Sequence, residues 1–445
     1  MDDRAARRSG YALTIPDVLL DSDAMRQACA ARNFQEIFRL VNRRTGSSHA
    51  VMAAAVGKMT SSRVSDIIRG VRGIRGREVI ERVADGFGIP GEMLGLPARP
   101  WESSGDSAQS DVALPVSVPQ FDRGKRVIQA LEVMNNDSAG ALPVVLGELI
   151  DHYALAIYSM PLTDVYEELL TVRNYASTFL GASLPAGHRK EITLSIGWLS
   201  CLLGVAACDM GSHAAAHVWC SDAERRSQEV GHPELSGWAV LTKSLIAFYQ
   251  GRPHQSVALA GQGQSITASG TLVHAKLATQ EMRAAAMAGD AARTETARRY
   301  ASKEMAGLPH DVALVGAFSM SPGEDPPYTA TSLMLLGRHH EAVTATNRVL
   351  ETLYRPGARQ RGEHPSSHAR ALLILGLAQA GAGNLDEAVS AGHDALAGSR
   401  PAWPTVTLAG KLSRVLERRF PKAVLVEEYR CRYLEVVGQP IGNTV

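Results

Sequence analysis

The stretch "MTSSRVSDIIRGVRGIRG", residues 59 to 76, decides the fold of the N-terminal part of the chain. Thr60 or Ser61 can cap a helix here, because a hydroxyl oxygen accepts a hydrogen bond from a free backbone N–H of the first turn. Three apolar residues follow at helical spacing and share one face: Val64, Ile67 and Ile68. Gly70 then ends the helix. The spacing predicts a short helix with a buried apolar face and a polar outer face.

Further short helices are expected on both sides of this stretch. "NFQEIFRLVNRR", residues 33 to 44, carries an apolar stripe at i, i+3, i+4 and i+7. "TGSSHAVMAAAVG", residues 45 to 57, predicts a stop at Gly46, a serine cap and a helix that ends near Gly57. "GREVIERVADGFGI", residues 76 to 89, predicts one more helix. Residues 22–101 are therefore expected to form one domain of short helices with a tight glycine turn in the middle.

The charge of this region differs from that of the whole chain. Residues 39 to 82 contain ten basic residues and three acidic ones, a balance of +7, whereas the 445-residue chain has a formal net charge of +1. A local basic module on an otherwise acidic protein is the charge distribution expected for contact with phosphates. The alternative is a charged face that is simply solvated.

A helix, a turn and a second helix can place the second helix in the major groove of DNA. Once the apolar face of this second helix is buried, its hydroxyls and arginines can bind base edges and phosphates. The residues expected to contact DNA are Arg43, Arg44, Ser48, Lys58, Thr60, Ser61, Ser62, Arg63, Ser65, Asp66, Arg69, Arg72, Arg75 and Arg77. Of these, Arg72, Arg75 and Arg77 are expected to bind phosphates rather than bases.

Asp66 is the exception among these residues, because a carboxylate that faces DNA is repelled by the phosphates. It can accept a hydrogen bond from a cytosine amine, or it can pair with Arg63 or Arg69 on its own helix. The pairing within the helix is the favoured interpretation.

The stretch "AAAVGKMTSSRVSDIIRG", residues 53 to 70, resembles the helix-turn-helix of the XRE-type, lambda-repressor-like transcription regulators. Ala54, Gly57 and the run from Arg63 to Gly70 match that motif, although the turn "GKM" is one residue longer than usual. Residues 79–97, "VIERVADGFGIPGEMLGLP", resemble the closing part of the same domain. The resemblance implies a sequence-specific DNA-binding regulator that acts as a homodimer on double-stranded DNA with a palindromic operator.

After a linker over residues 102–120, rich in serine, proline and acidic residues, the chain repeats a pattern of two helices. Five glycines fall between the two helices of each pair, at intervals of 40, 38, 48 and 46 residues: Gly211, Gly251, Gly289, Gly337 and Gly383. Small residues flank the turn glycine in at least two of the pairs: Gly204, Ala216 and Ala223 in one, and Gly376, Ala388 and Ala395 in the other. Small residues are needed there because the two helices cross closely.

This pattern resembles the tetratricopeptide repeat, with periods longer than usual. The fold class expected for the whole chain is therefore all-α: a helix-turn-helix domain followed, over residues 121–440, by an α-solenoid of tetratricopeptide-like hairpins. Such an array has no catalytic motif to support it, so we expect a binding protein and not an enzyme, with no cofactor.

The first helices of successive repeats line a concave groove in such an array. Six residues are expected there: Trp198, Asp209, Trp238, Lys276, Arg283 and Arg370. Two tryptophans and three cations could hold a peptide or small-molecule ligand by apolar anchoring, cation–π contacts and capture of a carboxylate. The alternative is that the tryptophans belong to the core and the cations are solvated.

Cys208, His213, His217 and Cys220 are of the residue types that bind metals, but no metal site is expected, because cysteine also packs as a small hydrophobe and no C-x2-C pair is present. Five scattered cysteines, no signal peptide and no uninterrupted apolar run of membrane length indicate a cytoplasmic protein, associated with the nucleoid when bound to DNA. The second function left open by the sequence is a tetratricopeptide-like interaction scaffold with a vestigial helix-turn-helix.

Overall fold

The computed structural model describes residues 15, 17–20, 22–45, 49–99, 123–137, 141–158, 160–181, 185–309, 312–313, 315–320, 325–354, 365–397 and 402–438. Every regular element in these ranges is a helix, which confirms the all-α class. The chain divides into two compact units: residues 1–118 with 310–315, and residues 119–309 with 316–445. The expected linker and the expected stop and cap at residues 46–48 lie outside the described ranges.

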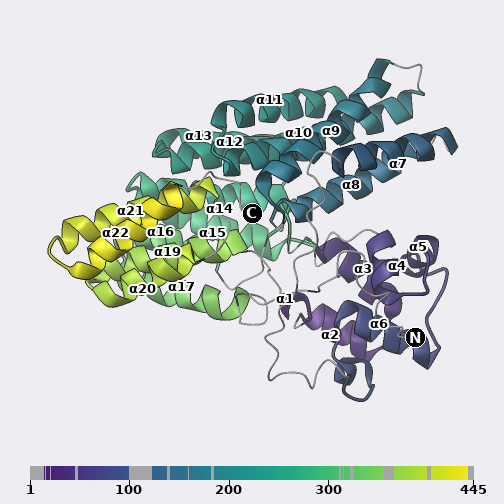
Figure 1. Ribbon diagram of the computed structural model, residues 1–445, viewed down its shortest axis with the longest axis horizontal. Coiled ribbons are helices and arrows are strands. Elements are labelled where there is room, and N and C mark those ends of the chain that lie inside the picture. The colour runs from purple at the N-terminus through teal and green to yellow at the C-terminus, as the bar shows by residue number, and fades with distance from the viewer. Residues whose placement is uncertain are drawn as a thin grey trace. The chain divides into compact units, whose positions relative to one another are not determined.

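The first unit is a bundle of short helices (Figure 1). Its elements are α1 Asp17–Leu20, α2 Asp23–Ala30, α3 Phe34–Thr45, α4 His49–Val56, α5 Ser61–Ile68, α6 Arg77–Phe87 and the 3-10 helix η2 Gly91–Leu94. Phe38 of α3 and Phe87 of α6 pack in its core, with ring centroids 4.9 Å apart. Gly86 lets α6 approach α4, because a Cβ there would lie 2.3 Å from the Ala55 carbonyl oxygen.

The second unit is a succession of longer helices. They are α7 Arg123–Asp137, α8 Leu142–Ala156, α9 Leu162–Thr178 with the 3-10 helix η4 Phe179–Gly181, α10 Ala186–Asp209, α11 His213–Val230, α12 Pro233–Tyr249, α13 Pro253–Ile266, α14 Leu272–Met287, α15 Ala291–Ala306, α16 Thr329–Leu335, α17 His339–Leu353, α19 Pro365–Ala382, α20 Leu385–Leu396, α21 Trp403–Arg419 and α22 Val424–Val437.

Consecutive helices pack as hairpins: α10 with α11, α12 with α13, α14 with α15, α16 with α17, and α19 with α20. Each of the five predicted glycines lies in the turn of one hairpin, and all have positive φ, between 72° and 97°. An L side chain is strained in this left-handed region, whereas glycine adopts it freely. The predicted position of the turns is therefore confirmed.

The small residues beside these turns also lie where the helices cross closely. A Cβ on Gly204 of α10 would lie 2.9 Å from the Cys220 Sγ of α11, and one on Gly376 of α19 would lie 3.0 Å from the Ala388 carbonyl oxygen of α20. Both distances are shorter than an ordinary van der Waals contact. The physical reason given for small residues at these positions is confirmed.

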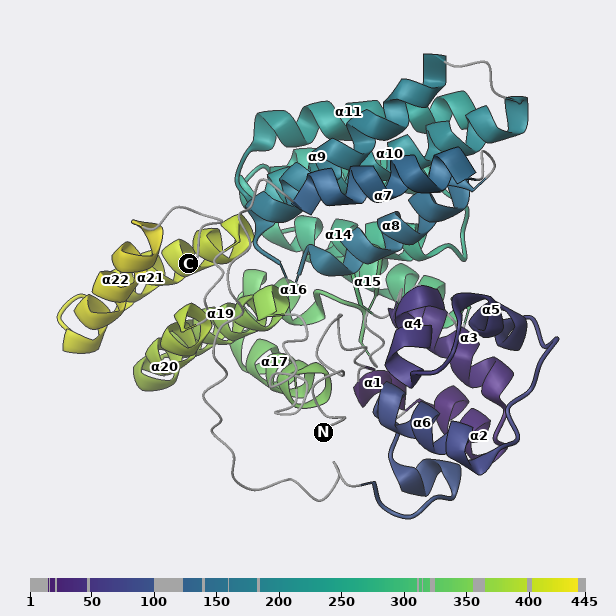
Figure 2. The same cartoon turned by 45° about the vertical axis from the view of Figure 1, so that its right-hand side comes forward.

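The first helices of the hairpins form an inner layer. From α10 through α12, α14, α16 and α19 to α21, each contacts the next, as well as the second helix of its own pair. Figures 1 and 2 both show α10 and α11 lying side by side. Residues of α10, α12 and α14 are buried around most of the helix, whereas α11, α13 and α15 are buried along one side only. This is the pattern of central helices covered by amphipathic ones.

The last hairpin, α21–α22, contacts the turn of the α10–α11 hairpin. The Trp403 ring, at the start of α21, lies 3.9 Å from the ring of His213 and 5.7 Å from that of Tyr249. It also covers the turn glycine Gly211, where an added Cβ would be 3.6 Å from the indole. Residues nearly two hundred positions apart are thus in contact, and the contacts join the α10–α11 turn to the C-terminal hairpin.

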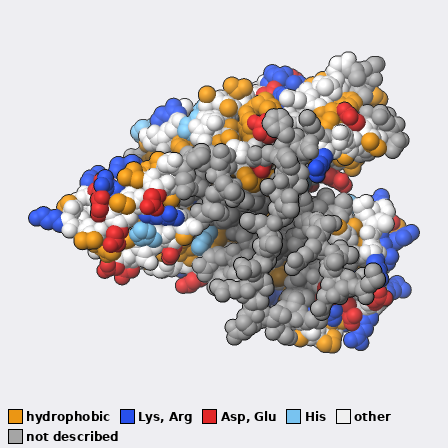
Figure 3. All heavy atoms as spheres, viewed as in Figure 1, with side chains coloured by type: hydrophobic (Ala, Val, Ile, Leu, Met, Phe, Trp, Pro, Cys, Tyr) orange, Lys and Arg blue, Asp and Glu red, His pale blue; other side chains and the backbone are white. Residues whose placement is uncertain are grey.

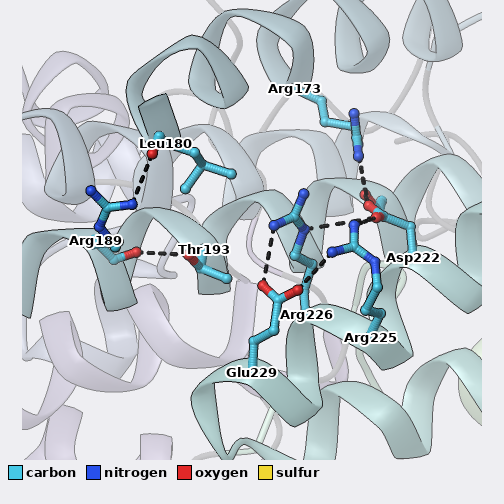
Figure 4. A network of polar contacts seen from close by, with 9 residues as sticks. Arg173, Leu180, Arg189, Thr193, Asp222, Arg225, Arg226 and Glu229 are labelled. Carbon is cyan, nitrogen blue, oxygen red and sulfur yellow. Dashed lines mark hydrogen bonds and ion pairs between the residues drawn. The ribbon is translucent and has the colours of Figure 1, made fainter. Parts of the chain in front are cut away.

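A polar network joins α9, α10 and α11 (Figure 4). Asp222 of α11 accepts hydrogen bonds from Arg173 of α9 at 2.6 Å, from Ser200 of α10 at 2.7 Å and from Arg225 at 2.5 Å. The Arg173 guanidinium also lies over the Trp219 ring, 4.8 Å from its centroid. Burial alone would raise the pKa of Asp222, but the hydrogen bonds from Arg173 and Ser200 outweigh it and hold the pKa below its ordinary value. Asp222 therefore stays ionised in its partly buried position.

Helix α10 is the one described helix that is long and apolar enough to cross a membrane by length and composition. Its mean hydropathy reaches 1.6 over eighteen residues, of which 78% are buried inside the unit. The burial is that of a core helix, because α10 packs against α8, α9, α11 and α12.

Candidate functional site

Helices α4 and α5 are joined by a turn of four residues. Gly57 and Lys58 both have positive φ, 67° and 50°, so the turn begins with two residues in the left-handed region. Thr60 is the N-cap of α5, and its hydroxyl oxygen accepts a hydrogen bond from the Arg63 backbone N–H at 3.3 Å. The first of the two predicted caps is thus the one used.

The apolar face of α5 holds this helix against the bundle. Val64 and Ile67 are fully buried and Ile68 is half-buried, so the predicted core face is confirmed for two residues and partly for the third. The Gln35 side chain of α3 donates to the Ile68 carbonyl oxygen at 3.3 Å. It fills the space beside Gly70, where a Cβ would lie 2.9 Å from the Gln35 Nε2. α5 therefore has a fixed orientation on α3 and α4.

The outer face of α5 is hydroxyl-rich. Thr60, Ser61 and Ser62 are exposed at its N-terminus, and Arg63 and Ser65 are half-buried. The Thr60 and Ser62 hydroxyl oxygens lie 3.1 Å apart and form a hydrogen bond. These short side chains lie at the end of the helix that carries the positive end of its dipole, where a phosphate is stabilised.

Asp66 lies on the same helix and pairs with two arginines. One carboxylate oxygen is 2.8 Å from an Arg69 nitrogen, and the other is 3.6 Å from the Arg72 Nε. The favoured interpretation of Asp66, a pair within the helix, is confirmed for Arg69. Arg63 does not share in it within the described part of the chain.

Five cationic side chains lie exposed around α5: Lys58, Arg69, Arg72, Arg75 and Arg77. Figure 3 shows Lys and Arg side chains gathered on the surface of the first unit, with acidic groups between them. Arg77 pairs with Glu81 at 3.0 Å, whereas no described residue forms an ion pair with Arg75. The side chains of Arg43 and Arg44, and the whole of Ser48, lie outside the described residues.

The two tryptophans predicted to bind a ligand, Trp198 and Trp238, both pack against another residue of the second unit. Phe318, from the segment between α15 and α16, lies between them, with ring centroids 4.8 Å from Trp198 and 5.2 Å from Trp238. The backbone N–H of Ala317 in this segment donates to the Ala154 carbonyl oxygen of α8 at 2.8 Å. Both tryptophans therefore contribute to internal packing, as the alternative interpretation expects, with Trp238 buried and Trp198 half-buried.

The four predicted polar residues form a separate interior cluster. Asp209 ends α10, Lys276 and Arg283 lie on α14, and Arg370 lies on α19, so three inner helices contribute to it. Electrostatic coupling links Asp209 with Arg370, and Lys276 with both arginines. Four tyrosines, which the sequence analysis does not name, also belong to this cluster: Tyr158, Tyr249, Tyr328 and Tyr354. A tyrosine near a helix end gives no signal in sequence that separates it from a core residue.

The cluster perturbs the groups inside it. Burial lowers the pKa of Lys276. Tyr328 opposes this shift, and the positive charges of Arg283 and Arg370 add to it. Burial raises the pKa of Asp209. Burial would also raise the pKa of Tyr328, but Arg283, Lys276 and Arg370 outweigh this and hold the pKa at about 8. This cluster therefore carries more positive than negative charge.

The residues considered for a metal have other contacts. The His213 ring packs on Trp403 and its Nδ1 forms a hydrogen bond with Gln250 at 2.9 Å. Cys220 is buried against Gly204. Among the described residues no three His, Cys, Asp or Glu side chains come together in a group able to hold a metal.

Comparison of the chain with known protein families and with curated proteins gives no match. The two sites are therefore interpreted from their own geometry: an exposed hydroxyl and arginine face on α5, and an electropositive cluster inside the second unit.

Proposed function

We propose that the chain is a sequence-specific DNA-binding transcription regulator of the XRE type, whose second unit is a tetratricopeptide-like solenoid that binds a peptide or small-molecule ligand and dimerises. The observation that carries the proposal is the α4–turn–α5 arrangement, in which the apolar face of α5 is buried and its hydroxyl and arginine face is exposed. The five hairpins with their turn glycines support the solenoid.

In this proposal the N-terminus of α5 enters the major groove. Thr60, Ser61 and Ser62 are short enough to let the backbone approach the DNA, and Arg63 can bind the edge of a guanine. Lys58 and Arg75 lie on either side of α5 in sequence and carry no ion pair within the described residues, so both are free to bind phosphates. A two-fold dimer would place its half-sites about 34 Å apart, one turn of DNA.

The test has two steps. Genomic fragments bound by the full chain are selected and sequenced, and the affinity for the recovered site and for a random duplex is measured from 50 to 300 mM salt. We expect one recurrent palindrome, and a decrease of about 0.9 per DNA-binding module in the slope of log affinity against log salt for Arg75→Gln. Arg299→Gln, an exposed arginine of α15, is the matched control and should leave the slope unchanged.

A second function, a protein-interaction scaffold with a vestigial helix-turn-helix, is favoured by one observation. Asp66 neutralises part of the charge of Arg69 and Arg72 on the face expected to meet DNA. A shallow salt slope with no preferred sequence among the selected fragments would exclude the regulator and leave the scaffold.

A further inference from the structure

The interior cluster of the second unit has an excess of positive charge. Lys276, Arg283 and Arg370 are cations, Asp209 is the acid coupled to them, and none of the four forms an ion pair within the described residues. Like charges that share a desolvated site repel one another. The three cations of the cluster therefore outnumber its one carboxylate.

Arg283 is the most enclosed of these residues. Only 2% of it is exposed, and its Nε donates to the Gln280 side-chain oxygen at 2.6 Å. One terminal nitrogen, Nη2, is buried without a hydrogen-bond partner. A buried donor of this kind is costly to leave unpaired, and most buried polar groups in folded proteins have a partner.

The guanidinium is held in place from two sides. Its carbon lies 3.8 Å from the centroid of the Tyr328 ring and 4.3 Å from that of Phe248, in cation–π contacts. On the other side, the Gln280 amide donates to the Ser256 hydroxyl at 2.9 Å, and Ser256 and Ser244 form hydrogen bonds with each other at 2.9 Å. All three polar side chains of this chain of contacts are fully buried. Arg283 is thus held by two aromatic rings and by a buried hydrogen-bond network through Gln280.

Tyr328 adds a second sign of a constrained site. Its φ of 71° lies in the left-handed region, where a bulky side chain is strained. Such strain is maintained where the surrounding structure fixes it, often beside a binding site. Lys276, Tyr328 and Arg370 are half-buried, so solvent reaches the cluster beside the fully buried guanidinium.

We propose that this cluster binds the anionic group of the ligand, a carboxylate or a phosphate, with Arg283 Nη2 as the central donor and with Lys276 and Arg370 balancing the remaining charge. The inference rests on the proposed ligand-binding role of the second unit and gives the chemistry of its ligand. The anion can be carried by a free organic acid or phosphate, or by the C-terminus of a peptide.

The experiment is isothermal titration calorimetry on the full chain without DNA. The probes are inorganic phosphate, succinate, tri-alanine with a free C-terminus, and the C-terminal amide of tri-alanine. We expect at least one of the first three to bind saturably, and Arg283→Gln to bind it roughly tenfold to hundredfold more weakly. Arg370→Gln, at a half-buried position, should weaken binding in the same direction and serves where Arg283→Gln does not fold. Arg299→Gln on α15 is the control with unchanged binding.

The probes also separate the sources of the anion. Binding of phosphate or succinate supports a free anion, and binding of tri-alanine but not of its amide supports a peptide C-terminus. Equal binding of tri-alanine and its amide, unchanged binding in both arginine variants, or no binding of any probe would overturn the inference. Operator affinity measured on the same protein preparation distinguishes the two proposals. Binding of an anion without binding of DNA would contradict only the regulator proposal, and binding of DNA without binding of any anion would contradict only the anion site.

Discussion

Replacing Asp66 by asparagine separates the two roles that this carboxylate can have if α5 faces DNA as proposed. The substitution keeps the size of the side chain and removes its charge. Because the carboxylate lies 2.8 Å from Arg69 and 3.6 Å from Arg72, it weakens the pull of both arginines on phosphates. If Asp66 serves the pair within the helix, Asp66→Asn should strengthen the binding of any DNA duplex.

The magnitude follows from Coulomb's law. A unit charge about 8 Å from a phosphate in water is repelled by roughly 0.5 kcal/mol, so removing it near two phosphates gains about 1 kcal/mol, or roughly fivefold in affinity for each DNA-binding module. Two arginines become free to displace counterions, which should increase the salt slope by up to about 1.8 for each module. Loss of the exposed pair itself costs about 0.5 kcal/mol or less of helix stability.

The assay is fluorescence anisotropy with a random-sequence duplex and with the selected operator, from 50 to 300 mM salt. Glu295→Gln in α15, which removes a carboxylate that pairs with Arg298 outside the basic module, is the control and should change neither affinity. Weaker binding of the operator alone would show that Asp66 accepts a hydrogen bond from a base. Unchanged binding of both duplexes would refute the placement of α5 against DNA.

Two further substitutions test the framework. Asp222→Asn should destabilise the second unit by about 2–4 kcal/mol at pH 7, seen as a lower urea midpoint, because it leaves Arg173 without its charged partner. The pKa of Asp222 is depressed in the folded chain, so the contribution of its carboxylate to stability is present above about pH 4 and is lost as the pH falls through the folded pKa. The urea midpoints of the variant and the unchanged chain should therefore converge in acid, and a constant difference between them would contradict this. Gly86→Ala should destabilise the first unit by about 1–3 kcal/mol, because its Cβ would lie 2.3 Å from the Ala55 carbonyl oxygen. Gly73→Ala is the control and should be nearly neutral, because the space around Gly73 is open. Equal thermal midpoints for the two variants would count against the close α4–α6 contact.

The sequence predicts local structure well at positions where the backbone conformation or the packing allows only one type of residue. Positive φ at the hairpin turns requires glycine, and a close helix crossing requires a small side chain, so Gly211 and Gly383, and Gly204 and Gly376, are found by their spacing alone. The hydroxyls and the apolar face after them limit the N-cap of α5 to Thr60 or Ser61, and the structure shows that it is Thr60. These features depend on neighbours in sequence, which a single chain shows directly.

Contacts between distant residues were not predictable in the same way. Nothing in the run "GAFSM", residues 316 to 320, indicates that Phe318 fills the space between Trp198 and Trp238. Trp403 packs on the α10–α11 turn, and its position there depends on how all the hairpins between them pack on one another. The hydrogen bond of the Gln280 side chain likewise depends on Ser256, which lies on the preceding hairpin.

The interior cluster gives a physical route by which a ligand could act on the rest of the chain. An anion bound by residues of both α14 and α19 would link these two helices, and the contact of Trp403 with the α10–α11 turn joins the last hairpin to the α10–α11 hairpin. A ligand shifts an equilibrium only by its difference in affinity for the two arrangements. Because such coupling is reciprocal, the factor by which the anion changes operator affinity must equal the factor by which the operator changes anion affinity, and unequal factors would show that the two measurements do not report one equilibrium.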